Sequence, residues 1–246
     1  MASIRAKGIV IRQSDYGEGH RLLDIFTEGL GIVKAVSYGA LKSKGAAAAS
    51  TQLLCYGDFT LYKGGGRFMS VNSADIRDSF YPVTEDIVKL ALTVYMSDIT
   101  YDILGENNAD ERILSLYLNS IYAMAYKNED PQKVKTVYEL KLMTAGGYMP
   151  SLYGCTACGA REEYAFSFEK GGAVCKKCGA KNSVRINGAV LSALRYIVGC
   201  EDKKMLSFSA TEQLLEYLNR ISENYISRQL DRKYKSLEYY NTVLMS

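Results

Sequence analysis

Residues 53–63, LLCYGDFTLYK, and residues 67–76, RFMSVNSADI, are separated by the triplet GGG at 64–66. In the first segment Phe59 and Leu61 alternate with more polar neighbours, which is the period of a strand that buries one face. The glycines interrupt this pattern, and the second segment resumes it. The stretch therefore predicts a β-hairpin with the glycines at its tip.

Three more short strands are expected before this hairpin. They cover Ile4–Arg12, Arg21–Thr27 and Gly31–Ser37, and glycine-rich turn signals at 15–19 and 28–31 separate them. Five strands within about 75 residues, joined by hairpins, fit a small closed barrel, and an OB-fold has that strand count and size. We expect residues 1–80 to form a five-stranded OB-fold barrel.

The pattern changes to helix after residue 82. Thr84 precedes apolar residues at helical spacing, so we expect it to cap a helix that ends at Gly105. A second helix is predicted from about Asp110 to Lys127. Asp130 followed by Pro131 is a strong start signal for a third, because it joins a capping carboxylate to proline at the first helical position.

Helical spacing is lost over about 151–186 and returns near Gly188. A last long helix is predicted to begin at Ser209, with Glu212 completing a capping box. The predicted class is therefore α+β: the barrel at 1–80, then a mainly α-helical domain at 81–246 that carries a cysteine-rich insertion at about 151–186.

The insertion contains two matched motifs, CTACGA at 155–160 and CKKCGA at 175–180. Two residues between the cysteines of a pair let both sulfurs face one ion from a tight turn, and a following glycine can take positive φ. A disulfide or a redox pair would explain one motif but not two. Cys155, Cys158, Cys175 and Cys178 are thus the predicted ligands of one structural Zn²⁺, forming a zinc ribbon. Cys55 and Cys200 are expected to be ordinary buried thiols.

Charge is unevenly distributed along the chain. Ten basic against seven acidic side chains lie in residues 1–80, six against ten in 81–150, and fourteen against ten in 151–246. A polyanion would therefore prefer the two ends. No stretch reaches the roughly 18 apolar residues of a membrane helix, and the first residues do not resemble a signal peptide. We expect a cytoplasmic protein with no membrane contact.

Basic side chains, with one aromatic residue among them, recur along the strands and loops of the predicted barrel. Single-stranded nucleic acid is held by such a combination, because cations follow the phosphates and aromatic rings stack the bases. An OB-fold barrel is a common scaffold for it. The predicted DNA-binding residues are Arg12, Arg21, Lys34, Tyr38, Lys42, Lys44, Lys63 and Arg67.

Several catalytic schemes are excluded by composition. His20 is the only histidine, so there is no HExxH motif and no evident Ser-His-Asp set. The GGG triplet lacks the P-loop pattern. His20 is expected to be a turn residue or surface contact, and the protein is expected not to be an enzyme.

The whole chain resembles the RecO family of bacterial recombination mediators. The resemblance is carried by Gly8–Ile11, Tyr16–Glu18, Arg21–Glu28 and Gly31, by the basic loop Tyr38–Lys44, and most specifically by Tyr138–Leu142 and Gly146–Pro150 running into the first cysteine pair. It implies an OB-fold followed by a helical domain with a zinc ribbon. It also implies binding of single- and double-stranded DNA, strand annealing, partnership with RecR, and contact with the C-terminal tail of single-stranded DNA-binding protein so that RecA can load on nucleoid DNA.

This chain departs from the family in one respect, since Lys42 and Lys44 stand in the basic loop where arginines are common. Lysine binds phosphate as a point charge, without a bidentate fork. Two other hypotheses stay open: a protein-docking adaptor whose barrel binds a protein, and an enzyme acting on nucleic acid.

Overall fold

The computed structural model describes residues 3–42, 46–161, 164–179 and 183–245. By internal contacts the chain divides into two units, one of residues 1–127 with 236–246 and the other of residues 128–235. The barrel thus shares its unit with four helices of the region that the sequence assigned to a separate domain at 81–246. Within the described residues, no helix is long and apolar enough to span a bilayer.

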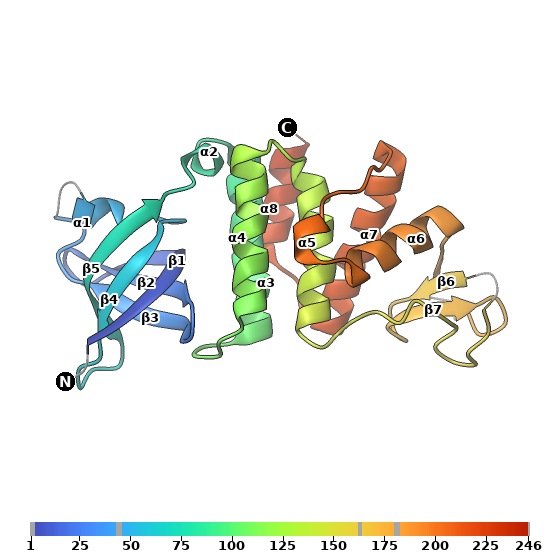
Figure 1. The fold of residues 1–246 in the computed structure, drawn as a ribbon, viewed down its shortest axis with the longest axis horizontal. Coiled ribbons are helices and arrows are strands. Elements are labelled where there is room, and N and C mark those ends of the chain that lie inside the picture. Colours follow the sequence, from blue (N-terminus) through green and yellow to red (C-terminus); the bar gives the residue numbers. More distant parts are fainter. Residues whose placement is uncertain (1–2, 43–45, 162–163, 180–182, 246) are drawn as a thin grey trace. The chain divides into compact units, whose positions relative to one another are not determined.

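The first unit begins with a closed barrel in the strand order β1-β2-β3-β5-β4 (Figure 1). Its strands are β1 (Ser3–Tyr16), β2 (His20–Thr27), β3 (Gly31–Ser37), β4 (Tyr56–Tyr62) and β5 (Met69–Asp78), with the short helix α1 (Ala46–Ala49) between β3 and β4. All neighbours are antiparallel except β3 and β5, which run parallel. The predicted five-stranded OB-fold barrel is confirmed, and residues 63–68 connect β4 to β5 as the glycine triplet indicated.

The barrel interior follows from strand alternation. Phe59 and Leu61 of β4 are fully buried and belong to one core cluster with Val10 of β1, Ile25 of β2 and Val33 of β3. Gly57 of β4 permits a close approach of the neighbouring β5, because a Cβ there would collide with the β5 backbone at a register shift.

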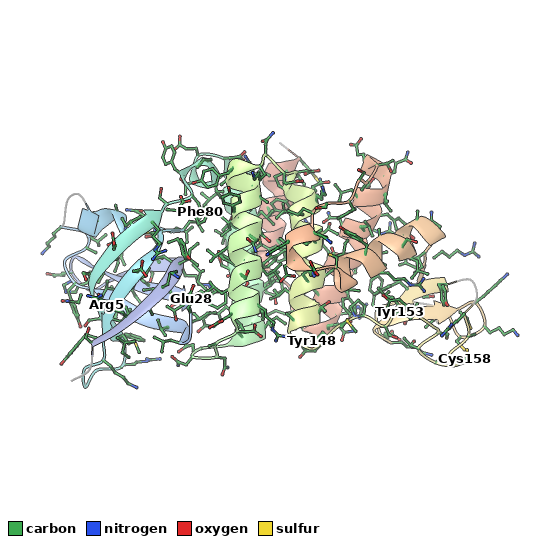
Figure 2. All side chains as sticks on the ribbon, viewed as in Figure 1. Arg5, Glu28, Phe80, Tyr148, Tyr153 and Cys158 are labelled. Carbon is green, nitrogen blue, oxygen red and sulfur yellow. The ribbon has the colours of Figure 1, made fainter. Side chains whose placement is uncertain are left out.

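Four helices complete the first unit: α2 (Tyr81–Thr84), α3 (Ile87–Leu104), α4 (Glu111–Tyr126) and α8 (Lys235–Leu244), whose first residue lies at the unit boundary. Phe80, labelled in Figure 2, precedes α2 with φ of 45°. The predicted cap of α3 is wrong: Thr84 ends α2, and Asp86 caps α3 by accepting from the N–H groups of Val88 and Lys89.

The barrel is joined to α3 through a network of charges. Arg12 donates to Asp98 of α3 at 2.6 Å, and its guanidinium lies 4.4 Å from the ring centre of Tyr101. Lys34 donates to Asp24 at 2.8 Å. Burial opposes the charge of Lys34, but hydrogen bonds to Asp24 and Tyr101 outweigh it and raise the lysine pKa.

The second unit is built from the helices α5 (Pro131–Ala145), α6 (Gly188–Gly199) and α7 (Glu212–Gln229), with a 3₁₀ turn at Asp202–Lys204. Asp130 and Pro131 start α5 as predicted, and Asn187 caps α6. The capping box at Ser209 is wrong, because α7 begins at Glu212 and its cap is Thr211, which accepts from the N–H of Leu214.

A three-stranded sheet is inserted between α5 and α6, in the order β7-β6-β8. Its strands are β6 (Tyr164–Ser167), β7 (Gly172–Cys175) and β8 (Ser183–Arg185). The side chain of Arg195 on α6 donates twice to the carbonyl of Leu152, and Gln229 of α7 donates to the carbonyl of Phe168. These bonds fasten the inserted sheet, the ribbon, to the helices of its own unit.

Candidate metal centre and nucleic-acid interface

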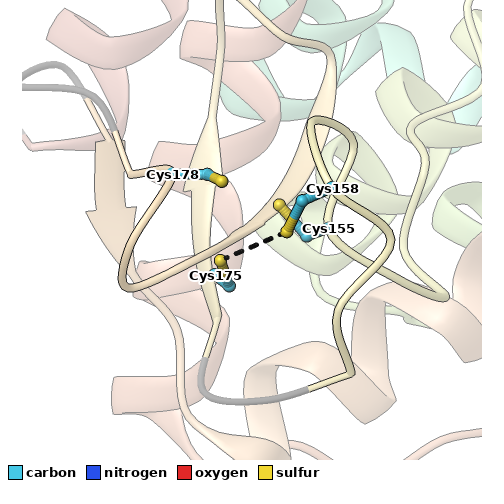
Figure 3. A group of neighbouring side chains, drawn as sticks. All are labelled: Cys155, Cys158, Cys175 and Cys178. Carbon is cyan, nitrogen blue, oxygen red and sulfur yellow. Dashed lines mark hydrogen bonds between the residues drawn. The ribbon is translucent and has the colours of Figure 1, made fainter.

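The four cysteines of the two matched motifs converge at the ribbon tip (Figure 3). Their sulfur atoms all lie within 4.8 Å of one another, and Cys158 Sγ lies 3.7 Å from Cys175 Sγ. With Zn–S bonds of about 2.3 Å, sulfurs at the corners of a tetrahedron are about 3.8 Å apart. The cluster is therefore of a size that can hold one tetrahedrally coordinated metal ion.

Two backbone turns place these sulfurs. The N–H of Gly159 donates to the carbonyl of Cys155 at 2.8 Å, and that of Gly179 donates to the carbonyl of Cys175 at 2.8 Å. Gly159 has the expected positive φ of 76°, whereas Gly179 closes its turn without entering that region. The first turn is tied to β7, because Thr156 N–H donates to Ala173 at 2.9 Å.

The electrostatics of the cluster favour a cation at its centre. Backbone N–H groups, that of Cys175 first, lower the pKa of the Cys155 thiol to about 6. The neighbouring sulfurs of Cys158 and Cys175 raise the pKa of Cys178 to about 12. Backbone N–H groups thus favour a thiolate at Cys155, and a bound metal ion would supply positive charge between the four sulfurs.

The other two cysteines lie elsewhere in the fold. Cys55 is in the barrel interior, where burial raises its pKa to about 11. Cys200 follows α6, and burial raises its pKa as well. Neither belongs to the cluster; Cys55 is the buried thiol that was expected, whereas Cys200 is only partly buried.

The predicted DNA-binding residues fall into separate groups. Arg12 and Lys34 are engaged with carboxylates of the barrel and α3, as described above. Arg21 donates to Thr51 at 3.1 Å and is partly buried. Lys63 is exposed just after β4. Lys44 lies outside the described residues.

A second group gathers around the β1–β2 turn. His20 Nδ1 accepts from the N–H of Gly39 at 2.9 Å, and the imidazole meets the ring of Tyr38 edge-on with centres 5.0 Å apart. Leu41 N–H donates to the carbonyl of Gly19, and the aliphatic part of Lys42 lies against that glycine. His20 is thus the surface contact that was expected, and it fixes a ring that is 65% exposed in Tyr38.

The β4–β5 connection brings a second aromatic pair to the end of β1. Phe68 meets Tyr16 edge-on at 6.0 Å between ring centres, and the guanidinium of Arg67 lies 5.2 Å from the Phe68 ring centre. Tyr16 and Phe68 were not selected from the sequence. The signal available there was an aromatic residue directly after Arg67, at the start of the second strand of the predicted hairpin.

Comparison with known protein families shows to which family the chain is related. Residues 1–80 match the family model "Recombination protein O N terminal", and residues 84–238 match "Recombination protein O C terminal". The chain belongs to the RecO family. The two models meet between residues 80 and 84, whereas contacts within the fold divide the chain near residue 127.

Curated relatives in this family agree along the full length. The DNA repair protein RecO of Acetivibrio thermocellus is 34% identical, over 99% of this chain and 98% of its own. That of Alkaliphilus metalliredigens is 29% identical over 96% and 97%, and that of Clostridium perfringens is 30% identical over 97% of each. The chain is therefore a member of a family of DNA repair proteins. Its structure contains a barrel and a four-cysteine cluster.

Proposed function

We propose that this chain is a non-catalytic mediator of recombination that binds single- and double-stranded DNA and anneals complementary strands. Its membership of the RecO family over its full length carries the proposal. The cation and aromatic groups of the barrel loops support it, because exposed rings beside cations suit bases and phosphates.

Within the barrel, the DNA-contacting surface is centred on Tyr38, Lys42 and Arg67. Lys63 extends it along the β4–β5 connection, and Lys44, which lies outside the described residues, is proposed to contribute a further cation. Arg12 and Lys34 play a different part, because a phosphate would have to displace Asp98 or Asp24 before reaching them. We assign these two chiefly to joining the barrel to α3. They therefore affect the orientation of the cationic surface only indirectly.

Fluorescence anisotropy with labelled single-stranded DNA tests this interface. The double variant Lys42→Gln/Arg67→Gln should weaken binding and lower the slope of log affinity against log salt by about 1.4, because each phosphate contact on a single strand contributes about 0.7. A matched control, Lys7→Gln/Arg77→Gln, removes the same charge from barrel cations already paired with Glu28 and Asp58. Wild-type protein without DNA affinity, with a partner captured after nuclease treatment, would favour the protein-docking adaptor instead.

The metal of the cysteine cluster is proposed to be a structural Zn²⁺. Four protein sulfurs leave no open coordination position, which suits a site that stabilises the ribbon rather than one that activates water. When bound, zinc would cross-link the two cysteine-containing turns. Metal analysis should find close to one zinc per chain, and a chelator should increase hydrogen exchange over residues 151–186 while leaving the barrel protected. A zinc content far below one per chain would contradict the proposal.

Partnership with RecR and with the C-terminal tail of single-stranded DNA-binding protein completes the proposal. These partners would let the chain act in the cytoplasm on nucleoid DNA that is covered by single-stranded DNA-binding protein, so that RecA can load. Purified components decide the matter: annealing of covered strands should require the intact tail, and RecA loading should require RecR. Turnover of DNA by the pure chain in the presence of metal would favour an enzyme.

A further inference from the structure

A groove of about 1200 Å³ lies within the second unit, next to the cysteine cluster, since its lining residues Lys176 and Gly179 directly follow Cys175 and Cys178. Ribbon residues Lys176, Ser183 and Arg185 line one side of it, and the first turns of α6 and α7 line the other. Its apolar surface comes from Ile186 and Leu214, among others. None of the uses proposed above for the chain involves this groove.

The groove is held in a fixed form by its own unit. Tyr217 of α7 donates a short hydrogen bond from its hydroxyl to the carbonyl of Arg185. Ile186 N–H donates to the carbonyl of Tyr164 at 3.2 Å. Because the bond from Tyr217 ends on the backbone of residue 185, the guanidinium of Arg185 is left exposed at the rim.

The charges that face the groove are positive. Lys176 and Arg185 are exposed, and no described residue that lines the groove is acidic. Both α6, with 12 residues, and α7, with 18, direct their N-termini to it, since Asn187 and Thr211 are lining residues. The positive end of each helix dipole adds to the attraction for an anion. Glu212, at the start of α7, does not line the groove.

Positive charge continues over the ribbon beyond the groove. In the described ribbon residues 153–161, 164–179 and 183–185, the only acidic side chain is Glu169; Glu162 and Glu163 lie outside the described residues. The exposed cations are Arg161, Lys170, Lys176, Lys177 and Arg185. An extended positive surface around a groove fits a polyanion better than a short peptide with one charged end.

We propose that this ribbon groove is a second binding site for single-stranded nucleic acid, with phosphates at Lys176 and Arg185 and bases against Tyr164, Tyr217 and the apolar surface. This inference rests on the proposed function. It adds a physical basis for annealing, because a chain with one strand on the barrel loops and another in the ribbon groove holds two strands at once.

A two-strand capture experiment with full-length, zinc-loaded protein tests the groove. Biotinylated oligo(dT) is immobilised and saturated with protein, and capture of fluorescent oligo(dT) is then measured, so that base pairing plays no part. The variant Lys176→Gln/Arg185→Gln should still bind the immobilised strand but lose most of the capture, about tenfold or more. The matched control Lys170→Gln/Lys177→Gln removes the same ribbon charge outside the groove and should lose only a small part of the capture.

The outcomes separate this inference from the proposed function. Failure of the wild type to bind even the first strand would remove the proposed function itself. First-strand binding with unchanged capture by the groove variant would overturn the second site alone, as would equal losses in the groove variant and the control. Loss of binding of an acidic peptide with an apolar C-terminus in the groove variant, with DNA capture intact, would reassign the groove to a protein partner.

Discussion

Tyr38 is the residue of the barrel whose ring is best placed to meet a base. It is 65% exposed and rests edge-on against His20. Stacking of one base on an aromatic ring is worth about 1–3 kcal/mol, so Tyr38→Ala should raise the Kd for single-stranded DNA by roughly 5- to 150-fold. Tyr38→Phe keeps the ring and should bind almost as the wild type does. Anisotropy titrations measure these Kd values. Equal affinities of the alanine and phenylalanine variants would show that Tyr38 does not stack on a base.

Lys135 is a fully buried cation in the second unit. Its ammonium lies 3.1 Å from Glu139, which is itself 1% exposed, and 2.7 Å from Glu223. Removing one member of a buried ion pair leaves an uncompensated charge and costs about 3–5 kcal/mol. Lys135→Met should lower the free energy of unfolding by that amount in urea titrations.

Lys133 offers the control for this prediction, because its pair with Glu129 is partly exposed. Such pairs contribute about 0–1 kcal/mol, so Lys133→Met should be nearly neutral. Adding Glu139→Leu to Lys135→Met should restore part of the lost stability, since it removes the stranded carboxylate. A Lys135→Met variant as stable as Lys133→Met would show that the buried charge is not what holds α5 to α7.

Residue types alone could not separate binding cations from structural ones. Arg12 and Lys42 look alike in the sequence, but Arg12 meets Asp98, a residue 86 positions away. No local pattern encodes that pairing, because it depends on where α3 lies against the barrel. The cysteine cluster is the opposite case, since two tight turns on adjacent parts of one small sheet bring the four sulfurs together and their spacing is local.

At the scale of elements, helix starts depend on which side chain reaches a free N–H. For α7 the cap is Thr211 rather than Ser209, although both are good capping residues. Thr211→Ala should cost about 1 kcal/mol of the free energy of unfolding, within a usual range of about 0.5–2. Ser209→Ala should cost much less. Parallel urea titrations compare them, and the reverse order would restore the capping box that the sequence suggested.

The start of α4 predicts a dependence on pH. A hydrogen bond from the Arg112 side chain, followed by bonds from the N–H groups of Ile113 and Arg112, lowers the pKa of Asp110. A carboxyl whose pKa is lower in the folded state stabilises it above the unfolded pKa, near 3.9, and loses that contribution as pH falls through the folded pKa. Asp110→Asn should therefore lose less stability than the wild type between pH 7 and pH 3. An identical loss in both proteins would contradict this assignment.

Elements with strong local signals were predictable, and those defined by tertiary contacts were not. The alternation in β4 and the Asp130-Pro131 start of α5 act within a few residues, so both were found. Helix α8 was missed because it is only 10 residues long and buries little besides Tyr240. The first residues of α3 were misassigned since Thr84 and Asp86 are both good caps, and the turn at Phe80 decides between them.

At the scale of the whole molecule, the end of the chain belongs with its beginning. Residues 236–246 group with residues 1–127, although residues 128–235 intervene. Ser236 of α8 donates to Asp98 of α3 at 2.6 Å, and Asp98 also receives Arg12 of the barrel. The carboxylate of Asp98 thus joins three segments that are distant in sequence.

Removal of α8 should consequently act on the unit that contains the barrel. Deleting residues 235–246 takes away the Ser236 bond and the fully buried Tyr240, and loss of a large buried ring costs about 3–5 kcal/mol. Hydrogen exchange should increase in α3, α4 and β1, while α5, α6 and the ribbon keep their protection, because separate cooperative units open independently. The milder variant Ser236→Ala should move the same segments by a smaller amount. An increase of exchange in α5 and α6 with the barrel unit unchanged would show that α8 stabilises the second unit. That result would contradict the grouping of the two ends of the chain in one unit.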